Sequence, residues 1–407
     1  MTKKPASPTP PPPRRRRWLI WIGGLLAVCL LSMVGIGFGG WLALRQRFAD
    51  LPDTHDLDTR LATEAQAYLA DRPNGALVIG VVQDGRTAVF GFGAMDDGSA
   101  PDADTVYEIG SISKVLTGLT LAALVSDGTV AITDTLGSLV ESTTSDYGGG
   151  NRASPAIALI TLQHLVTHTS GLPRLPQSLS DDELAGEDPY AAYDSARLWQ
   201  DLRTAQLENA PGLAHLYSNY GAGVLGQTLA QTTGQDYAAL VAERILKPLT
   251  LSDTVVELTD AQRDRLAPGH VLGSNAGAPN WTLNALAPAG GFKSTARDLT
   301  DLIAANLTAA TGSRPIDRAL LESHAILYSS WDVTMAYGWF VQDQLWGQRV
   351  LWHNGGTGGY TSYIAIDFEH QAGIVLLSNY GDAMAGDNDL DALGLVSLPL
   401  IARVSLP

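Results

Sequence analysis

Residues 107–114 read YEIGSISK, and this stretch decides how the 407-residue chain is interpreted. It ends in the pattern Ser-x-x-Lys, and the apolar run that follows through Ser126 predicts a helix buried on nearly all sides. Residues three apart on a helix share a face, so the Lys114 amine can reach the Ser111 hydroxyl. A buried ammonium is poorly solvated, which lowers its pKa and lets Lys114 accept a proton from the serine.

The Ser-x-x-Lys pattern is weak by itself, because Ser111 and Lys114 also fit a helix cap followed by a lysine that reaches solvent. Two further motifs support the catalytic interpretation. Tyr217-Ser218-Asn219 lies at a predicted loop-to-helix junction, where a tyrosine can relay a proton and an asparagine can hold a lysine and a substrate amide. An ordinary turn with a capping asparagine is the structural alternative. The motif gains weight only beside the first one.

The third motif, HNGG at residues 353–356, ends a predicted strand. Glycines at a strand end let a substrate approach the backbone closely. A backbone N–H at this position can contribute to an oxyanion hole. The alternative is a plain glycine turn.

In this order and at these separations, the three motifs resemble the penicillin-recognising serine hydrolases. The most similar group is the class C β-lactamase-related one, with its D-Ala-D-Ala carboxypeptidases, D-aminopeptidases and esterases. The resemblance covers roughly residues 57–382 and includes further stretches: HTSGLP at 168–173, Pro248-Leu249, AGGF at 289–292 and LSN at 377–379. It implies a β-lactamase/transpeptidase-like α/β (α+β) fold and hydrolysis through an acyl-enzyme.

The resemblance also implies roles for the motif residues. Ser111 would be the nucleophile, Lys114 its activating partner, and Tyr217 the group that passes a proton to the leaving group and helps to activate water. Asn219 would hold the substrate amide. The backbone N–H groups of Ser111 and Gly356 would form the oxyanion hole, with His353 and Gly355 completing the substrate-binding strand end. Sequence does not decide whether Lys114 or Tyr217 is the acylation base, a question also disputed for other Ser-x-x-Lys enzymes.

The chain departs from many of these relatives at His353, where β-lactamases and many carboxypeptidases have a lysine whose cation binds a substrate carboxylate. An imidazole is neutral much of the time at pH 7. Relatives with histidine here include aminopeptidases and esterases. The resemblance therefore supports acyl transfer more strongly than it supports β-lactam hydrolysis.

The N-terminal region predicts a membrane anchor. Residues 18–44 are 27 residues without a charge, long enough to cross a bilayer, with tryptophans near both ends. Four arginines precede this run, which places the N-terminus in the cytoplasm and the remainder outside a bacterial-type cell membrane. A cleaved signal peptide fits less well, since the run is long and no A-x-A site follows. We thus expect a disordered Pro-rich basic tail (1–17), a signal-anchor helix (18–44), a linker (45–56) and a hydrolase domain (57–407).

Composition excludes several other classes of function. The first 47 residues carry eight basic side chains and no acid, so the remainder has a net charge of −24 against −16 for the whole chain. The strongly negative charge of residues 48–407 argues against nucleic acid as a partner. The single cysteine, Cys29, lies in the apolar run, which excludes disulfides and thiolate metal sites elsewhere. We expect no cofactor and no metal, since His164 and His168 lack the glutamate of the zinc motif H-E-x-x-H. No serine lies in a G-x-S-x-G motif, which excludes the usual nucleophile turn of the α/β-hydrolases.

Hydrophobic periodicity predicts one antiparallel sheet built from both ends of the domain, flanked by helices, with an all-helical lobe between. A cleft between lobes is a usual place for an active site. The predicted strands are 76–82 and 87–92, joined by a turn at Asp84-Gly85, and then 336–341, 348–352, 360–366 and 372–377. The predicted helices are 57–69, 112–126, 161–168, 219–232, 236–246 and one capped by Ser294 or Thr295. Residues 173–207 read as a loop-rich excursion.

These observations favour an anchored extracytoplasmic hydrolase that cleaves an amide or ester in a small molecule or peptide, foremost a D-amino-acid peptide of the cell wall. A β-lactamase and a small-ester esterase are alternatives within the same chemistry. A non-catalytic penicillin- or peptidoglycan-binding receptor is the alternative from another class. The complete set of motifs and the short cytoplasmic tail argue against a receptor. The sequence does not predict the oligomeric state.

Overall fold

The first and last strands of the domain pair with each other, so both ends of the domain build one sheet. In the computed structural model, which describes residues 57–140, 155–343, 349–381 and 389–401, β1 (Ala76–Gln83) pairs antiparallel with β2 (Arg86–Gly93) and with β11 (Ala372–Ser378). Asp84 and Gly85 have φ of 48° and 77°, the conformation of a tight hairpin turn. The predicted hairpin and the predicted closure of the sheet are confirmed.

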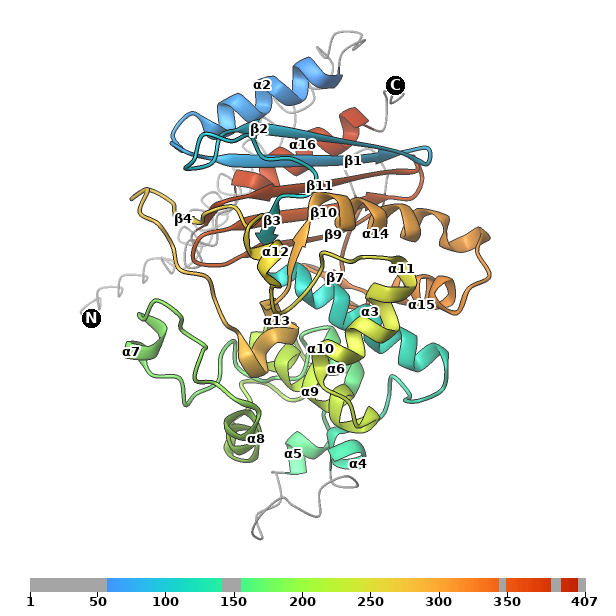
Figure 1. The fold of residues 1–407 in the computed structure, drawn as a ribbon. Helices are drawn as coiled ribbons and strands as arrows, with labels where there is room; N and C mark the ends of the chain where they lie inside the picture. The colour runs from blue at the N-terminus through green and yellow to red at the C-terminus, as the bar shows by residue number, and fades with distance from the viewer. Residues whose placement is uncertain (1–56, 141–154, 344–348, 382–388, 402–407) are drawn as a thin grey trace, which may run out of the picture. The chain divides into compact units, whose positions relative to one another are not determined.

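The main sheet has eight strands in the order β2-β1-β11-β10-β9-β8-β7-β6, all antiparallel to their neighbours (Figure 1). Two short ladders, β12-β4 and β3-β5, lie outside it. The remaining strands are β3 (Val106–Glu108), β4 (His270–Val271), β5 (Lys293–Thr295), β6 (Tyr328–Ser329), β7 (Thr334–Met335), β8 (Phe340–Asp343), β9 (Arg349–Gly356), β10 (Thr361–Asp367) and β12 (Tyr380–Gly381). The predicted strand 336–341 is wrong in its first half, because the chain turns at Gly338, with φ of 73°, between β7 and β8.

Helices cover both faces of the sheet because its central strands are apolar on both sides. In β1, Leu77, Ile79 and Val81 pack with α2 (Leu57–Leu69) and α16 (Asp389–Ile401). Val78 and Val82 of the same strand belong to a second core with α3 (Ser113–Ser126), α14 (Ala296–Thr308) and α15 (Pro315–Ser323). Figure 1 shows α2 and α14 on opposite sides of β1 and β11.

Helix α3 joins this second core to the core of the helical lobe. Its first half contributes Val115 and Leu119 to the core beneath the sheet, and its second half contributes Leu121 and Leu124 to the lobe. The other helices are α4 (Leu136–Val140), α5 (Pro155–Ala158), α6 (Leu162–Val166), α7 (Asp181–Leu184), α8 (Ser195–Thr204), α9 (Asn219–Thr233), α10 (Tyr237–Val241), α11 (Lys247–Leu249), α12 (Asp260–Arg263), α13 (Ala287–Gly290), the 3₁₀ turns η1 (Gly110–Ile112), η3 (Asn284–Leu286) and η4 (Ala309–Thr311), and the π-helical η2 (Ala242–Leu246).

Two helical predictions need correction. The stretch 173–207 is not only loop, since it contains α7 and α8; Asp194 caps α8, and Leu198 and Leu202 bury one face of that short amphipathic helix. The predicted helix 236–246 is α-helical only to Val241 and then widens into η2. The cap of α14 is Thr295, which accepts a hydrogen bond from the Asp298 N–H.

The predicted tail, anchor and linker, residues 1–56, lie outside the described residues. Across the ranges that are described, no helix is both long enough and apolar enough to cross a membrane.

Candidate active site

The nucleophile candidate, Ser111, lies in η1, immediately before α3, with its backbone pressed against the end of β9. Gly110 has φ of 47°, a left-handed conformation that favours glycine. A Cβ on Gly110 would lie 2.6 Å from the Gly356 nitrogen, and one on Gly355 would lie 2.1 Å from the Ile109 oxygen and 2.9 Å from the Ser111 nitrogen. Glycine at 110 and 355 is therefore what lets the strand approach the serine so closely.

Lys114 lies one turn into the helical segment, buried to 3% exposure. Its Nζ donates to the Ser111 Oγ at 3.0 Å and to the Ala289 carbonyl oxygen at 2.5 Å. Burial, and secondly the positive charge of Arg174, hold the pKa of Lys114 well below its usual value. The predicted Ser111–Lys114 contact is thus present, with a lysine biased towards the neutral amine.

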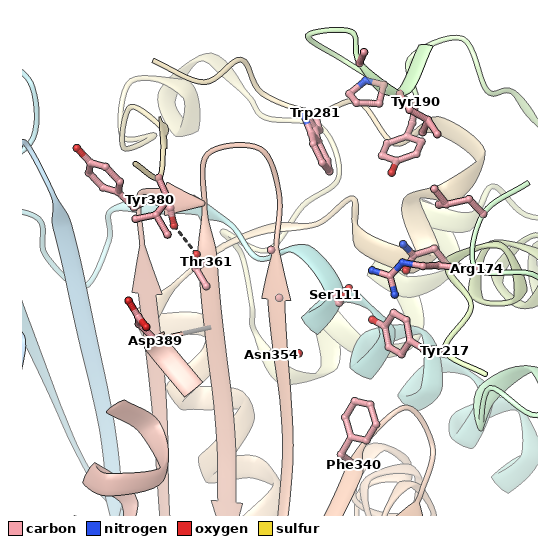
Figure 2. Close-up of a pocket in the computed structure, with 18 of the residues that line it drawn as sticks. Ser111, Arg174, Tyr190, Tyr217, Trp281, Phe340, Asn354, Thr361, Tyr380 and Asp389 are labelled. Atoms are coloured by element: carbon pink, nitrogen blue, oxygen red, sulfur yellow. Dashed lines mark hydrogen bonds between the residues drawn. The ribbon is translucent and has the colours of Figure 1, made fainter. Parts of the chain in front are cut away.

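Tyr217 faces the same hydroxyl from the helical lobe. Figure 2 shows its phenol directed towards Ser111, and its ring centroid lies 4.8 Å from the Lys114 Nζ. Burial raises the pKa of Tyr217 to about 12, although the nearby Ser111 and the charge of Arg174 oppose that change. The phenol therefore keeps its proton at neutral pH.

Asn219 begins α9, beside the serine. Ser218 caps that helix by accepting a hydrogen bond from the Gly221 N–H. The side-chain Oδ1 of Asn219 is buried without a hydrogen-bond partner, although the residue lines the pocket. A buried unpaired acceptor costs free energy unless a ligand donates to it. This geometry fits an acceptor for a substrate N–H.

At the end of β9, Asn354, Gly355 and Gly356 line the pocket, whereas His353 is fully buried behind its wall. The Nδ1 of His353 lies 2.5 Å from the Asn354 carbonyl oxygen, and its Nε2 has no partner. Burial and the nearby Lys114 lower the pKa of His353 to about 3, so the imidazole is neutral. His353 supplies no cation to the pocket.

The pocket itself has a volume of about 800 Å³ and lies between the end of β9 and the helical lobe. Figure 2 shows Ser111 at its centre, with Asn354 on one side and Tyr217 and Arg174 on the other. Sequence reasoning missed several lining residues, among them Arg174, Tyr190, Trp281 and Phe340. Of these four, only Arg174 carried a signal, because it directly follows the HTSGLP stretch at 168–173.

The two histidines in that part of the chain have structural contacts. The Nδ1 of His164 accepts a hydrogen bond from the Thr161 N–H and completes a capping box at α6. The Nδ1 of His168 accepts from the Ser218 N–H, and its ring packs on that of Tyr217 with centroids 4.5 Å apart. His168 therefore helps to fix the loop that carries Tyr217.

Comparisons with known proteins agree with this fold and site. A model of the Beta-lactamase family matches residues 61–396, so the chain belongs to that family. It is a serine hydrolase of the β-lactamase/D-Ala carboxypeptidase-like type. The chain is 28% identical over 336 residues to the D-alanyl-D-alanine-carboxypeptidase/endopeptidase AmpH of Escherichia coli (strain K12), covering 76% of this chain and 82% of that one. It is 25% identical over 337 residues to a β-lactamase of Pseudomonas fluorescens, covering 74% and 88%.

Solved structures show the same fold. The class C β-lactamase from Rhodobacter sphaeroides superposes with a TM-score of 0.70 at 21% identity, covering 85% of this chain and all of that one. The β-lactamase/D-alanine carboxypeptidase from Pseudomonas syringae superposes with a TM-score of 0.71 at 21% identity, covering 86% and 99%. The predicted β-lactamase/transpeptidase-like fold is confirmed.

Proposed function

We propose that this protein is a membrane-anchored extracytoplasmic hydrolase that forms an acyl-enzyme on Ser111 and cleaves an amide or ester, foremost in a D-amino-acid peptide. One observation carries the proposal: the Ser111 hydroxyl contacts a buried lysine and faces a half-buried tyrosine, and the pKa values of these two side chains are shifted in opposite directions. Paired groups with pKa values moved apart are typical of acid–base catalysis.

Lys114 is the acylation base in this proposal. Its lowered pKa favours the free amine, whereas the raised pKa of Tyr217 disfavours a phenolate. As the Ser111 Oγ attacks the substrate carbonyl carbon, its proton passes to the Lys114 Nζ. The backbone N–H groups of Ser111 and Gly356 stabilise the negative oxygen that forms.

Tyr217 completes the reaction as a proton relay. Its phenol donates a proton to the leaving nitrogen or oxygen as the bond to the acyl carbon breaks, and takes one from the ammonium of Lys114. A water molecule then attacks the acyl-enzyme by the reverse route and releases Ser111. The unpaired Oδ1 of Asn219 accepts a hydrogen bond from the substrate amide.

Support for a D-amino-acid peptide comes from the names of two relatives, a D-alanyl-D-alanine-carboxypeptidase/endopeptidase and a β-lactamase/D-alanine carboxypeptidase. Support for the anchor is the uncharged run at 18–44 with arginines on one side. The matching β-lactamases keep β-lactam hydrolysis as the second candidate. The neutral, buried His353 does not supply the cation with which a lysine at this position would bind a substrate carboxylate, so it favours neither candidate over the other.

The test is covalent labelling of the purified full-length protein with a fluorophosphonate and a fluorescent penicillin. We expect an adduct on Ser111 by mass spectrometry in the wild type and none in Ser111→Ala. A folded wild-type protein that labels with neither probe would contradict the proposal. Rates on nitrocefin, a p-nitrophenyl ester and a D-Ala-D-Ala peptide then separate the three substrate classes, and acylation without turnover would favour the receptor.

A further inference from the structure

We propose that Arg174 is the residue that recognises a carboxylate on the substrate, an inference that rests on the hydrolase function proposed above. The pocket needs such a group if its substrate is anionic, because the neutral His353 lies behind the wall and carries no charge into it.

Arg174 is the pocket-lining arginine whose charge is available. Two arginines are among the described residues that line the pocket, Arg72 and Arg174. Arg72 is paired with Asp71 at 2.6 Å and Asp389 at 2.7 Å. Arg174 is exposed, and within the described ranges it takes part in no ion pair. An approaching anion thus meets an uncompensated guanidinium.

The backbone of Arg174 is held in place by the start of α9. Its carbonyl oxygen accepts hydrogen bonds from the Asn219 N–H at 2.9 Å and the Tyr220 N–H at 3.2 Å. The preceding carbonyl, of Pro173, accepts from the Ser218 hydroxyl at 2.6 Å. The guanidinium is therefore carried by a segment fixed to the same helix start that presents Asn219.

The side chain of Arg174 reaches the reacting groups. Its Cζ lies 5.3 Å from the centroid of the Tyr217 ring, and Figure 2 shows it between Tyr217 and Tyr190 on the side of Ser111 away from β9. A guanidinium against aromatic faces keeps its planar N–H edge open for a bidentate carboxylate. Since the chain beyond its first 47 residues is strongly acidic and Asp181 and Asp389 also line the pocket, this cation is the local attraction that an anionic substrate would need.

Matched esters test the proposal in the full-length protein. One pair places the charge on the leaving group: 3-carboxyphenyl and 3-carbamoylphenyl phenylacetate. The other places it on the acyl part: the 4-nitrophenyl monoesters of adipic acid and of adipamic acid. The readout is the ratio of kcat/KM for the charged ester to that for its neutral partner. Because this ratio compares two substrates of one variant, it cancels a general loss of folding or of Lys114 reactivity.

We expect Arg174→Gln to lower that ratio about 10-fold in at least one pair, which also tells on which side of the scissile bond the carboxylate lies. Arg174→Lys should retain part of the preference, and the control Arg318→Gln, an exposed arginine of α15 outside the pocket, should leave it unchanged. An unchanged ratio in both pairs, with wild-type turnover present, overturns the role of Arg174. Failure of the wild type to be acylated by any ester overturns the proposed function instead.

Discussion

Two lysines are buried in the described part of the chain, and the charges around them differ in sign. Lys114 in α3 is 3% exposed and Lys293 in β5 is 8% exposed. Burial lowers the pKa of both. Around Lys293, however, Glu108, Asp188 and Glu257 oppose that effect, whereas the neighbouring charge at Lys114 is the cation of Arg174.

The hydrogen-bond partners differ in the same way. Lys293 donates to three backbone carbonyls, those of Val256, Trp281 and Gly291, each at 3.3 Å. Its register partner across the β3-β5 ladder is Glu108, itself 2% exposed. Lys114 has a single carbonyl and the hydroxyl of Ser111. Burial without a nearby carboxylate favours the neutral amine, whereas carboxylates around a buried lysine oppose the loss of its proton.

The largest expected effect is that of the substitution Lys114→Ala on the rate of acylation. Its proposed role is proton transfer, so acylation of Ser111 should fall by about 10²- to 10⁴-fold, measured by stopped-flow with a chromogenic substrate. The free energy of unfolding should change far less than activity does. A loss of activity that merely tracks the loss of folded protein would mean that Lys114 is structural and would break the comparison.

Lys293→Met should show the opposite profile. Removing this cation leaves the carboxyl of Glu108 buried beside an apolar side chain, so we expect a loss of about 3 kcal/mol in unfolding free energy, at the low end for a broken buried pair because the two groups are not in direct contact. Acylation by the folded fraction should change only a few-fold. Urea unfolding followed by fluorescence measures the first quantity, and stopped-flow acylation with the same chromogenic substrate, normalised to folded protein, measures the second.

The double variant Glu108→Gln/Lys293→Met sharpens the same point. Its loss of unfolding free energy should be smaller than the sum of the losses in the two single variants by at least about 1 kcal/mol. The reason is that the second substitution removes the charge that the first leaves unpaired. Additive costs would show that the two side chains are energetically independent, and that the carboxylates do not distinguish Lys293 from Lys114.

The smallest expected effect is a displacement of the pH profile. The acylation rate should rise with pH as Lys114 loses its proton, with a midpoint below the ordinary lysine value of 10.5. In Arg174→Gln a neighbouring cation is gone, the protonated form is less disfavoured, and the pKa of Lys114 should rise, moving that limb to higher pH. An unchanged midpoint of the pH profile would show that the charge of Arg174 does not affect the pKa of Lys114. Neutral esters are the substrate of choice here, since they separate this effect from carboxylate binding.

The local pattern along the chain was enough to predict much of the fold. The continuous apolar runs at 76–82 and 372–377 gave strands that pair, and the apolar run after Ser111 gave the buried helix α3. Short elements were missed: α7 has four residues, and β3 and β5 have three each, which is too short for periodicity to register.

By itself, the sequence determined that Ser111 and Lys114 are neighbours, because their spacing in one continuous helical segment is a local property, as is the helix start at Tyr217-Ser218-Asn219. Only the tertiary structure decided what surrounds those groups. Segments far apart in the chain bury His353, leave the charge of Arg174 without an ion-pair partner among the described residues, and bring acidic side chains near Lys293. Solvation and charge act through space, so one buried lysine has a hydroxyl and a cation as neighbours whereas the other lies among carboxylates.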